Sequence, residues 1–256
     1  MFTHTTDTLG QPQVSVVATS ADWNKFLGRD TGAASPPFLR AGQQLTARDG
    51  IFGQAVFVLA FGLAALTLGE AVVIRSDYSV VRAVAGSRGV VGVSMSANTS
   101  ATELSWYCIQ GSVPLKVTAG AAANLPLYLT ATAGSPSVTV VATDQIVGGF
   151  SATAVSATVS TKTVNTSTAG DAKQLGVPNL DGLYVGMLVT GTGIAASSEI
   201  TAIGEGGLML GAQSPAAGFV TLNNSMTATA AVTGTFLHKS TFLTALLQRP
   251  VAAGLG

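Results

Sequence analysis

The residues closest to a known ligand-binding pattern are GTGIAA at residues 191–196. They fit the GxGxxA form, in which glycines let the backbone approach a dinucleotide pyrophosphate held at the N-terminus of a helix. The next residues, SSEITAIG, have the composition of a strand and begin within one helical turn of the motif. Because the helix that this chemistry requires is not expected there, we predict no dinucleotide site and no cofactor.

The ionisable side chains are too scattered to form a recognisable catalytic or metal site. His4 and His238 lie near opposite ends of the chain and cannot by themselves make a zinc triad or the base of a Ser-His-Asp triad, so we predict both to be surface or interface residues. No GxSxG, HExxH or P-loop motif occurs. Calcium loops need several carboxylates close together in sequence, and glycoside hydrolases need two facing a cleft. Neither can be placed, so we predict no catalytic residue, no metal site and no enzyme activity.

Other polar and aromatic side chains have structural explanations. Cys108 is the only cysteine, so no internal disulfide forms, and in an alternating strand it is expected to be buried as a small apolar residue. Asn98 and Asn165 begin Asn-x-Ser/Thr triplets and are interpreted as turn residues. Tyr184 and Phe219 are candidates for stacking on a sugar, with core packing as the favoured alternative. The acidic residues expected near turns or strand ends are Asp30, Asp49, Glu70, Asp77, Glu103 and Asp144.

The composition favours an assembling β protein. Of 256 residues, 47% are apolar, which is enough to bury a core in each of two small domains. Only 9% are charged and the formal net charge is zero, so the surface must consist largely of small and hydroxylated side chains, and copies do not repel one another. The twelve Lys and Arg residues are scattered, which argues against a nucleic-acid partner.

A membrane partner is not expected either. The first residues, MFTHTTDTLGQPQ, lack the basic and apolar segments of a signal peptide. Residues 51–69 carry no charge over about the length of a bilayer span, but Gly53, Gly62 and Gly69 divide them into strand-length pieces. We interpret this segment as two buried strands joined by a turn.

A continuous strand pattern runs from about residue 47 to residue 156 and is centred on residues 89–130. Short apolar runs rich in Val, Ile, Tyr and Trp are broken there by Gly, Pro, Asn and Ser. Residues 104–109 and 113–118 alternate with a period of two, which predicts one inward-facing set of side chains. The intervening QGS predicts a tight hairpin, with Gly111 at positive φ.

Residues 1–45 are predicted to form an extended N-terminal arm with one short helix. Ser20 is a favourable N-cap and Gly28 a natural stop, and Trp23, Phe26 and Leu27 share one face between them. These three side chains need a partner surface, which is either the end of the chain's own core or a neighbouring subunit. Phe38 lies in the extended, proline-containing SPPFLR at residues 35–40.

The sequences WYCIQGSVPLKV, TAGAAAN, LYLTATAG and DQIVGG together resemble the small β-domain of tailed-phage head decoration, or capsid cement, proteins. The resemblance covers roughly residues 50–155, and ALLQRPVAAG at residues 245–254 looks like the family's final strand. It implies an all-β fold of two small β-barrel or β-sandwich domains. The implied capsid-binding domain comprises residues 46–157 and 238–256, and residues 158–237 form an inserted β-domain that projects outward. Residues 170–176 are read as a loose approach to it, after a Ser/Thr-rich leader.

The resemblance implies a structural virion protein of a bacteriophage. It would be made in the host cytoplasm, bind the outer capsid surface and stabilise the capsid by bridging subunits of the major capsid protein, as a homotrimer. The candidate capsid or subunit contacts are Trp23, Phe26, Leu27 and Phe38. The alternative is a tail-fibre or receptor-binding accessory protein of the virion that binds a cell-surface glycan through the inserted domain.

Overall fold

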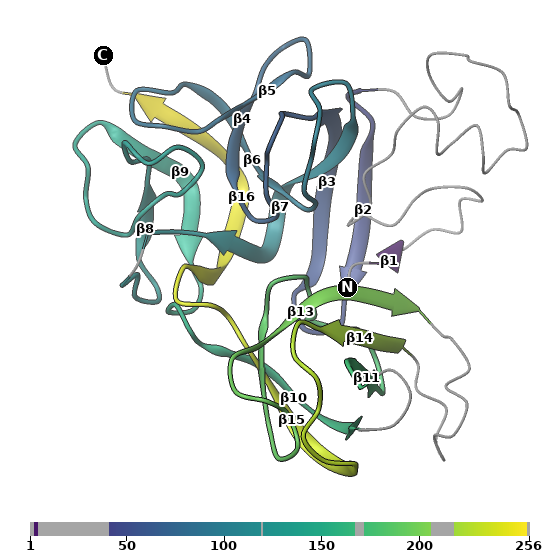
Figure 1. Cartoon of the computed structure of the whole chain (residues 1–256). Helices are drawn as coiled ribbons and strands as arrows, with labels where there is room; N and C mark the ends of the chain where they lie inside the picture. The colour runs from purple at the N-terminus through teal and green to yellow at the C-terminus, as the bar shows by residue number, and fades with distance from the viewer. Residues whose placement is uncertain (1–2, 5–40, 119, 167–171, 206–217, 255–256) are drawn as a thin grey trace, which may run out of the picture. The chain divides into compact units, whose positions relative to one another are not determined.

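The computed structural model describes residues 3–4, 41–118, 120–166, 172–205 and 218–254, and this part of the chain is all-β, with no helix (Figure 1). The predicted all-β class is therefore confirmed. The chain divides into two compact units. Residues 156–240 form one, here called the barrel unit, and residues 2–155 with 241–256 form the other, the sheet unit.

The sheet unit is one large antiparallel sheet whose strands run in the order β1-β2-β3-β7-β16-β6-β4-β5, with β9 on the other edge of β16 and β8 beside β9. Its strands are β1 (Thr3–His4), β2 (Gln44–Asp49), β3 (Gly53–Phe61), β4 (Ala71–Ile74), β5 (Val80–Arg82), β6 (Gly89–Ser94), β7 (Leu104–Lys116), β8 (Pro126–Tyr128), β9 (Asp144–Ser151) and β16 (Phe242–Gly254). The last strand of the chain thus lies in the sheet unit, between β9 on one edge and β7 and β6 on the other.

The hairpin predicted at QGS is wrong, because β7 runs through it as a single strand of 13 residues. Gly111 has the expected positive φ, +110°, and directly follows an irregularity in the pairing of β7 with β3, which lies between Cys108 and Gln110. Residues before it pair with β3, and residues from Gln110 to Lys116 pair with β16. A Cβ atom at Gly111 would lie 2.6 Å from the Cβ of Ala55, so the close approach of the backbones requires glycine.

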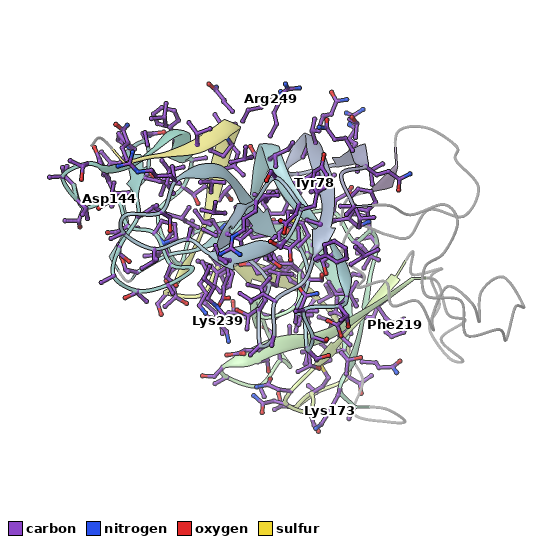
Figure 2. All side chains as sticks on the ribbon, turned by 90° about the horizontal axis from the view of Figure 1, so that it is seen from above. Tyr78, Asp144, Lys173, Phe219, Lys239 and Arg249 are labelled. Atoms are coloured by element: carbon purple, nitrogen blue, oxygen red, sulfur yellow. The ribbon has the colours of Figure 1, made fainter. Side chains whose placement is uncertain are left out.

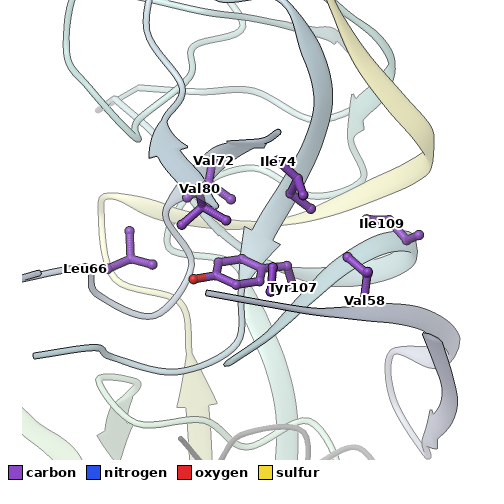
Figure 3. Close-up of a cluster of buried hydrophobic side chains, with 8 residues drawn as sticks. Val58, Leu66, Val72, Ile74, Val80, Tyr107 and Ile109 are labelled. Atoms are coloured by element: carbon purple, nitrogen blue, oxygen red, sulfur yellow. The ribbon is translucent and has the colours of Figure 1, made fainter. Parts of the chain in front are cut away.

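The core of the sheet unit packs on both faces of β7. Trp106, Tyr107 and Cys108 are each at most 1% exposed, so the predicted division into one inward and one outward set is wrong for this central strand. The ring of Tyr107 lies in a cluster of buried aliphatic side chains (Figure 3). These neighbours are Val58, Ala60, Leu66, Val72, Ile74, Val80 and Ile109. The Tyr107 hydroxyl donates to the carbonyl oxygen of Phe61 at 3.2 Å, which satisfies its polar end.

The prediction of two strands within residues 51–69 is right for only one of them. The nine-residue strand β3 lies there, but a loop follows it, and the next strand, β4, begins beyond the segment at Ala71. Among the described residues, the structure has no helix that is long and apolar enough to cross a bilayer.

The barrel unit closes six antiparallel strands in the order β10-β11-β14-β13-β12-β15. They are β10 (Thr158–Thr166), β11 (Gln174–Val177), β12 (Leu188–Thr190), β13 (Ser198–Glu205), β14 (Gly218–Leu222) and β15 (Ala230–Leu237). The segment expected as a Ser/Thr-rich leader is β10, which pairs with β15 along almost its whole length, and part of the expected loose approach is β11. Residues 181–187, which precede β12, form turns and irregular structure.

The chain enters and leaves the barrel unit at adjacent points. The amide of His238 donates to the carbonyl oxygen of Ala157 at 2.9 Å, and the amide of Ser156 donates to that of Lys239 at 3.3 Å. Because the two ends are tied together, inserting the barrel unit into the sheet unit adds little loop-closure entropy. The predicted arm helix, with Trp23, Phe26 and Leu27, lies outside the described residues, as do Phe38 and Asp30.

Candidate functional site

Glu70 is the centre of a buried ionic cluster in the sheet unit. Its carboxylate, in the loop before β4, accepts hydrogen bonds from Arg82 Nε at 2.8 Å and from Lys116 Nζ at 3.0 Å. Burial alone would raise the pKa of Glu70, but the hydrogen bonds from Lys116 and Arg82 outweigh it, and the pKa lies below its ordinary value. The cluster ties the loop before β4 to β5 and β7. Because both carboxylate oxygens are held by cations, we interpret it as a structural lock.

A second buried polar pair lies in the barrel unit. The Tyr184 hydroxyl and His238 Nδ1 are 2.7 Å apart, and the two residues are 5% and 0% exposed. Burial lowers the pKa of His238 to about 4 and raises that of Tyr184, so the imidazole is neutral at pH 7. The prediction that His238 is a surface or interface residue is therefore wrong, and Tyr184 is not an exposed platform for a sugar. Phe219 is half-buried, with its ring packed over Gly204.

Cys108 and Asn98 also serve the fold. Cys108 is fully buried, as predicted, and burial raises the pKa of its thiol to about 12, so thiolate chemistry is suppressed. Asn98 is only 2% exposed, and its Nδ2 donates to Ser105 Oγ at 2.6 Å and to Glu103 at 3.2 Å. Asn165, which was predicted to be a turn residue, lies in β10 opposite Gly176 and Ala231.

Among the acidic residues, Asp49 ends β2 and accepts from the amides of the following turn, Ile51 at 2.7 Å and Phe52 at 2.9 Å. The other described acidic residues in the predicted set also lie at turns or strand ends, and they are Glu70, Asp77, Glu103 and Asp144. The strand predicted after GTGIAA is present as β13. Within the described residues, no three His, Cys, Asp or Glu side chains are placed to hold a metal ion together.

The candidate interaction site is an apolar surface on three neighbouring strands of the sheet unit. Val90 of β6, Val251 of β16 and Val147 of β9 stand in one row, because Val251 is the register partner of both others. Leu246 and Phe150 form a second matched pair on β16 and β9. All five are 36–47% exposed, whereas the residues next to them on β16, Leu247 and Ala252, are buried. We call these five residues the β16 face.

The second candidate surface lies where β3 ends and the turn between β4 and β5 begins. Phe61 and Tyr78 are each 39% exposed and adjacent, since the Phe61 amide donates to the Tyr78 carbonyl oxygen at 2.9 Å. Asp77 precedes Tyr78, and the carbonyl oxygen of Glu103 accepts from the amide of Gly62 at 2.7 Å. We call Phe61, Tyr78, Asp77 and Glu103 the Phe61 surface.

The described surface of the barrel unit has a different character. Of the eleven large apolar side chains that are exposed in the described part of the chain, ten belong to the sheet unit and only Val185 to the barrel unit. Threonines occupy matched positions on neighbouring barrel strands, with Thr235 of β15 opposite both Thr161 of β10 and Thr190 of β12. The sheet unit is therefore the one whose described surface suits apolar docking.

Sequence reasoning did not find either surface, because the five residues of the β16 face come from three separate segments of the chain. Only the pairing of β6, β9 and β16 brings them together. No protein-family model matches this chain, and no curated protein or solved structure is significantly similar to it.

Proposed function

We propose that this chain is a structural protein of a tailed-phage virion that binds the outer surface of the capsid and stabilises it. In this proposal the sheet unit and the N-terminal arm fasten onto the major capsid protein, and the barrel unit points away from the shell. The proposal rests on the resemblance of residues 50–155 to capsid decoration proteins. The observation that supports it best is the concentration of exposed apolar side chains on the sheet unit.

The mechanism would be burial of apolar surface. Each Å² of apolar area removed from water contributes about 25 cal/mol, before the cost of immobilising the partners. A protein that contacts two or more capsid subunits at once also gains effective concentration, since the second contact forms within a complex that already exists. The shell is then held against internal pressure without a covalent bond, and a homotrimer, which the resemblance implies, would multiply these contacts.

The test is the binding of the purified chain to expanded, empty shells of the phage that encodes it, followed by co-sedimentation. We expect saturable binding to the outside of the shell. A chain that begins at residue 41 keeps β2 and should bind more weakly, because it lacks most of the predicted arm, including Trp23, Phe26, Leu27 and Phe38. Equal binding by both chains would remove the arm from the mechanism, and no binding by the full chain would refute the proposal.

The alternative proposal is a tail-fibre or receptor-binding component that uses the barrel unit to bind a glycan. The matched hydroxyls of Thr161, Thr235 and Thr190 favour it, since they offer hydrogen-bond donors and acceptors to a sugar. Copy number separates the two proposals. A shell protein is present on the order of hundreds of copies for each particle, because a symmetric shell repeats each site many times, whereas a tail protein has few.

A further inference from the structure

We propose that copies of this chain associate head to tail, with the β16 face of one copy binding the Phe61 surface of the next. Both surfaces belong to the sheet unit, and neither is covered by the described residues. The β16 face presents five apolar side chains on three adjacent strands, and the Phe61 surface presents two exposed aromatic side chains. Aromatic side chains are the usual anchors of protein interfaces, and a contiguous exposed apolar patch marks an interaction site.

The charges around the two surfaces are of opposite sign. The β16 face is bordered by Arg249, which lies at the periphery of the sheet unit (Figure 2), and by Arg88, which comes two residues before Val90. The only acidic residue on β6, β9 or β16 is Asp144, which is buried and accepts from the amide of Gly86 at 2.6 Å.

The Phe61 surface carries two carboxylates, those of Asp77 and Glu103, and Arg75 lies close enough to Asp77 for its charge to help lower the pKa of that carboxyl. Hydrogen bonds hold the pKa of both carboxyls below their ordinary values. For Asp77 the main cause is the hydrogen bond from the Ser79 hydroxyl. For Glu103 burial raises the pKa, but the hydrogen bonds from Thr99 and its neighbours outweigh this effect. Both are therefore ionised at pH 7. A face bordered by arginines fits a surface bordered by carboxylates, whereas two β16 faces would bring like charges together.

Further exposed apolar side chains come from the segments that flank β8 and β9. Leu125 and Val140, at 39% and 72% exposed, lie in the segments next to β8 and β9. Gln145 of β9 and Gln248 of β16 supply uncharged polar side chains on two of the same strands. An apolar centre with few charges and a polar rim is the composition of lasting interfaces between copies of one chain. Because the two contacting surfaces differ, the association is heterologous and can close into a ring.

This inference rests on the proposed function only in taking assembly as the role of the chain. It is tested on free protein without shells, so its failure and the failure of shell binding are seen separately. The measurement is sedimentation velocity of the full chain across a range of concentrations. The variants are Val251→Glu, which places a charge at the centre of the β16 face, and Phe61→Glu, which does so in the Phe61 surface. Val185→Glu, at a residue 44% exposed on the barrel unit, is the matched control.

We expect the unchanged chain and Val185→Glu to sediment as an assembly larger than the 25.6 kDa chain. Each of the other two variants should sediment as a monomer, with association weakened on the order of a hundredfold or more by an unpaired charge in the interface. A mixture of Val251→Glu and Phe61→Glu should form a complex of one copy of each, because one intact surface remains on each chain. That complex cannot grow further, since its remaining surfaces are both blocked.

Three results would overturn the inference: an unchanged chain that is monomeric throughout, a Phe61→Glu variant that assembles like the unchanged chain, or a mixture that stays monomeric. If Val251→Glu fails to fold by circular dichroism, Val147→Lys on the neighbouring strand tests the same row. A monomeric chain whose binding to shells is lost in Val251→Glu would assign the β16 face to the capsid and likewise overturn the inference.

Discussion

Acid should destabilise the barrel unit through His238 before it affects the carboxylates. Burial lowers the pKa of His238 from 6.5 to about 4. Between these values the unfolded chain binds a proton that the folded chain excludes, so the free energy of unfolding falls as the pH falls. The difference between the two pKa values, at 1.36 kcal/mol for each pKa unit, amounts to a loss of about 3 kcal/mol. That is a large share of the roughly 5–15 kcal/mol that stabilises a typical domain.

The window of this loss separates it from the effect of Glu70. The pKa of Glu70 lies below its ordinary value of 4.5, so the stability that its ionised form contributes is present above pH 4.5 and is lost only below it. Glu70 also belongs to the sheet unit, whereas His238 belongs to the barrel unit. A decline between pH 6.5 and pH 4.5 that is confined to the barrel unit therefore reports His238.

The assay is a proton NMR titration of the two histidine rings, combined with urea unfolding at several pH values. The ring of His238 should titrate near pH 4. Its signals are simple to assign, because the chain has only one other histidine, His4. His238→Gln should be less stable at pH 7, by about 1 kcal/mol for the lost hydrogen bond with Tyr184, but its stability should be nearly constant from pH 6.5 to 4.5. A His238 ring that titrates near 6.5, or an unchanged pH profile in the variant, would refute the reasoning.

Three further predictions concern the sheet unit. Glu70→Gln should lower the free energy of unfolding by about 3 kcal/mol, because Arg82 and Lys116 lose their buried counter-ion. Urea unfolding followed by tryptophan fluorescence measures this change. A loss below about 1 kcal/mol would contradict the structural role of the Glu70 cluster. Gly111→Ala should lower the free energy of unfolding by at least about 2 kcal/mol, because alanine is strained at positive φ and its Cβ would overlap with a neighbouring backbone. Gly53→Ala is the control, since Gly53 has positive φ but open space around it, and should cost about 1 kcal/mol. Equal losses in the two variants would contradict the close packing at Gly111. The Cys108 thiol should react with a thiol reagent only on unfolding, and fast labelling of the native chain would contradict its burial.

The sequence predicted the strands better than their partners. Runs of β-branched and aromatic residues separated by glycine were sufficient to expect β3, β7 and β16, because strand propensity and burial act locally. The error at Gly111 arose because glycine at positive φ suits both a hairpin turn and a continuous strand that approaches its neighbour closely. Only the pairing of Gly111 with Leu247 of β16 and its close approach to Ala55 distinguish the two. The segment predicted to be a Ser/Thr-rich leader forms β10. It was not recognised as a strand because it carries threonine and serine where it pairs with β15, and so lacks an apolar pattern.

The site was less predictable than the fold. His238 follows β15 immediately, and its burial depends on Tyr184, which is 54 residues earlier in the chain. The β16 face depends on register between segments separated by the whole barrel unit, and neither composition nor periodicity specifies which strands meet. The dispersed acidic residues at turns were anticipated because short polar side chains satisfy turn amides, as Asp49 does.

The proposed role on the outer capsid surface is tested most directly by an electron cryo-microscopy map of purified particles. We predict density for this chain repeated across the outside of the shell, with a large β-sheet against the major capsid protein and a six-stranded barrel farther out. A shell without such density, or density for this chain only at the tail, would contradict the account.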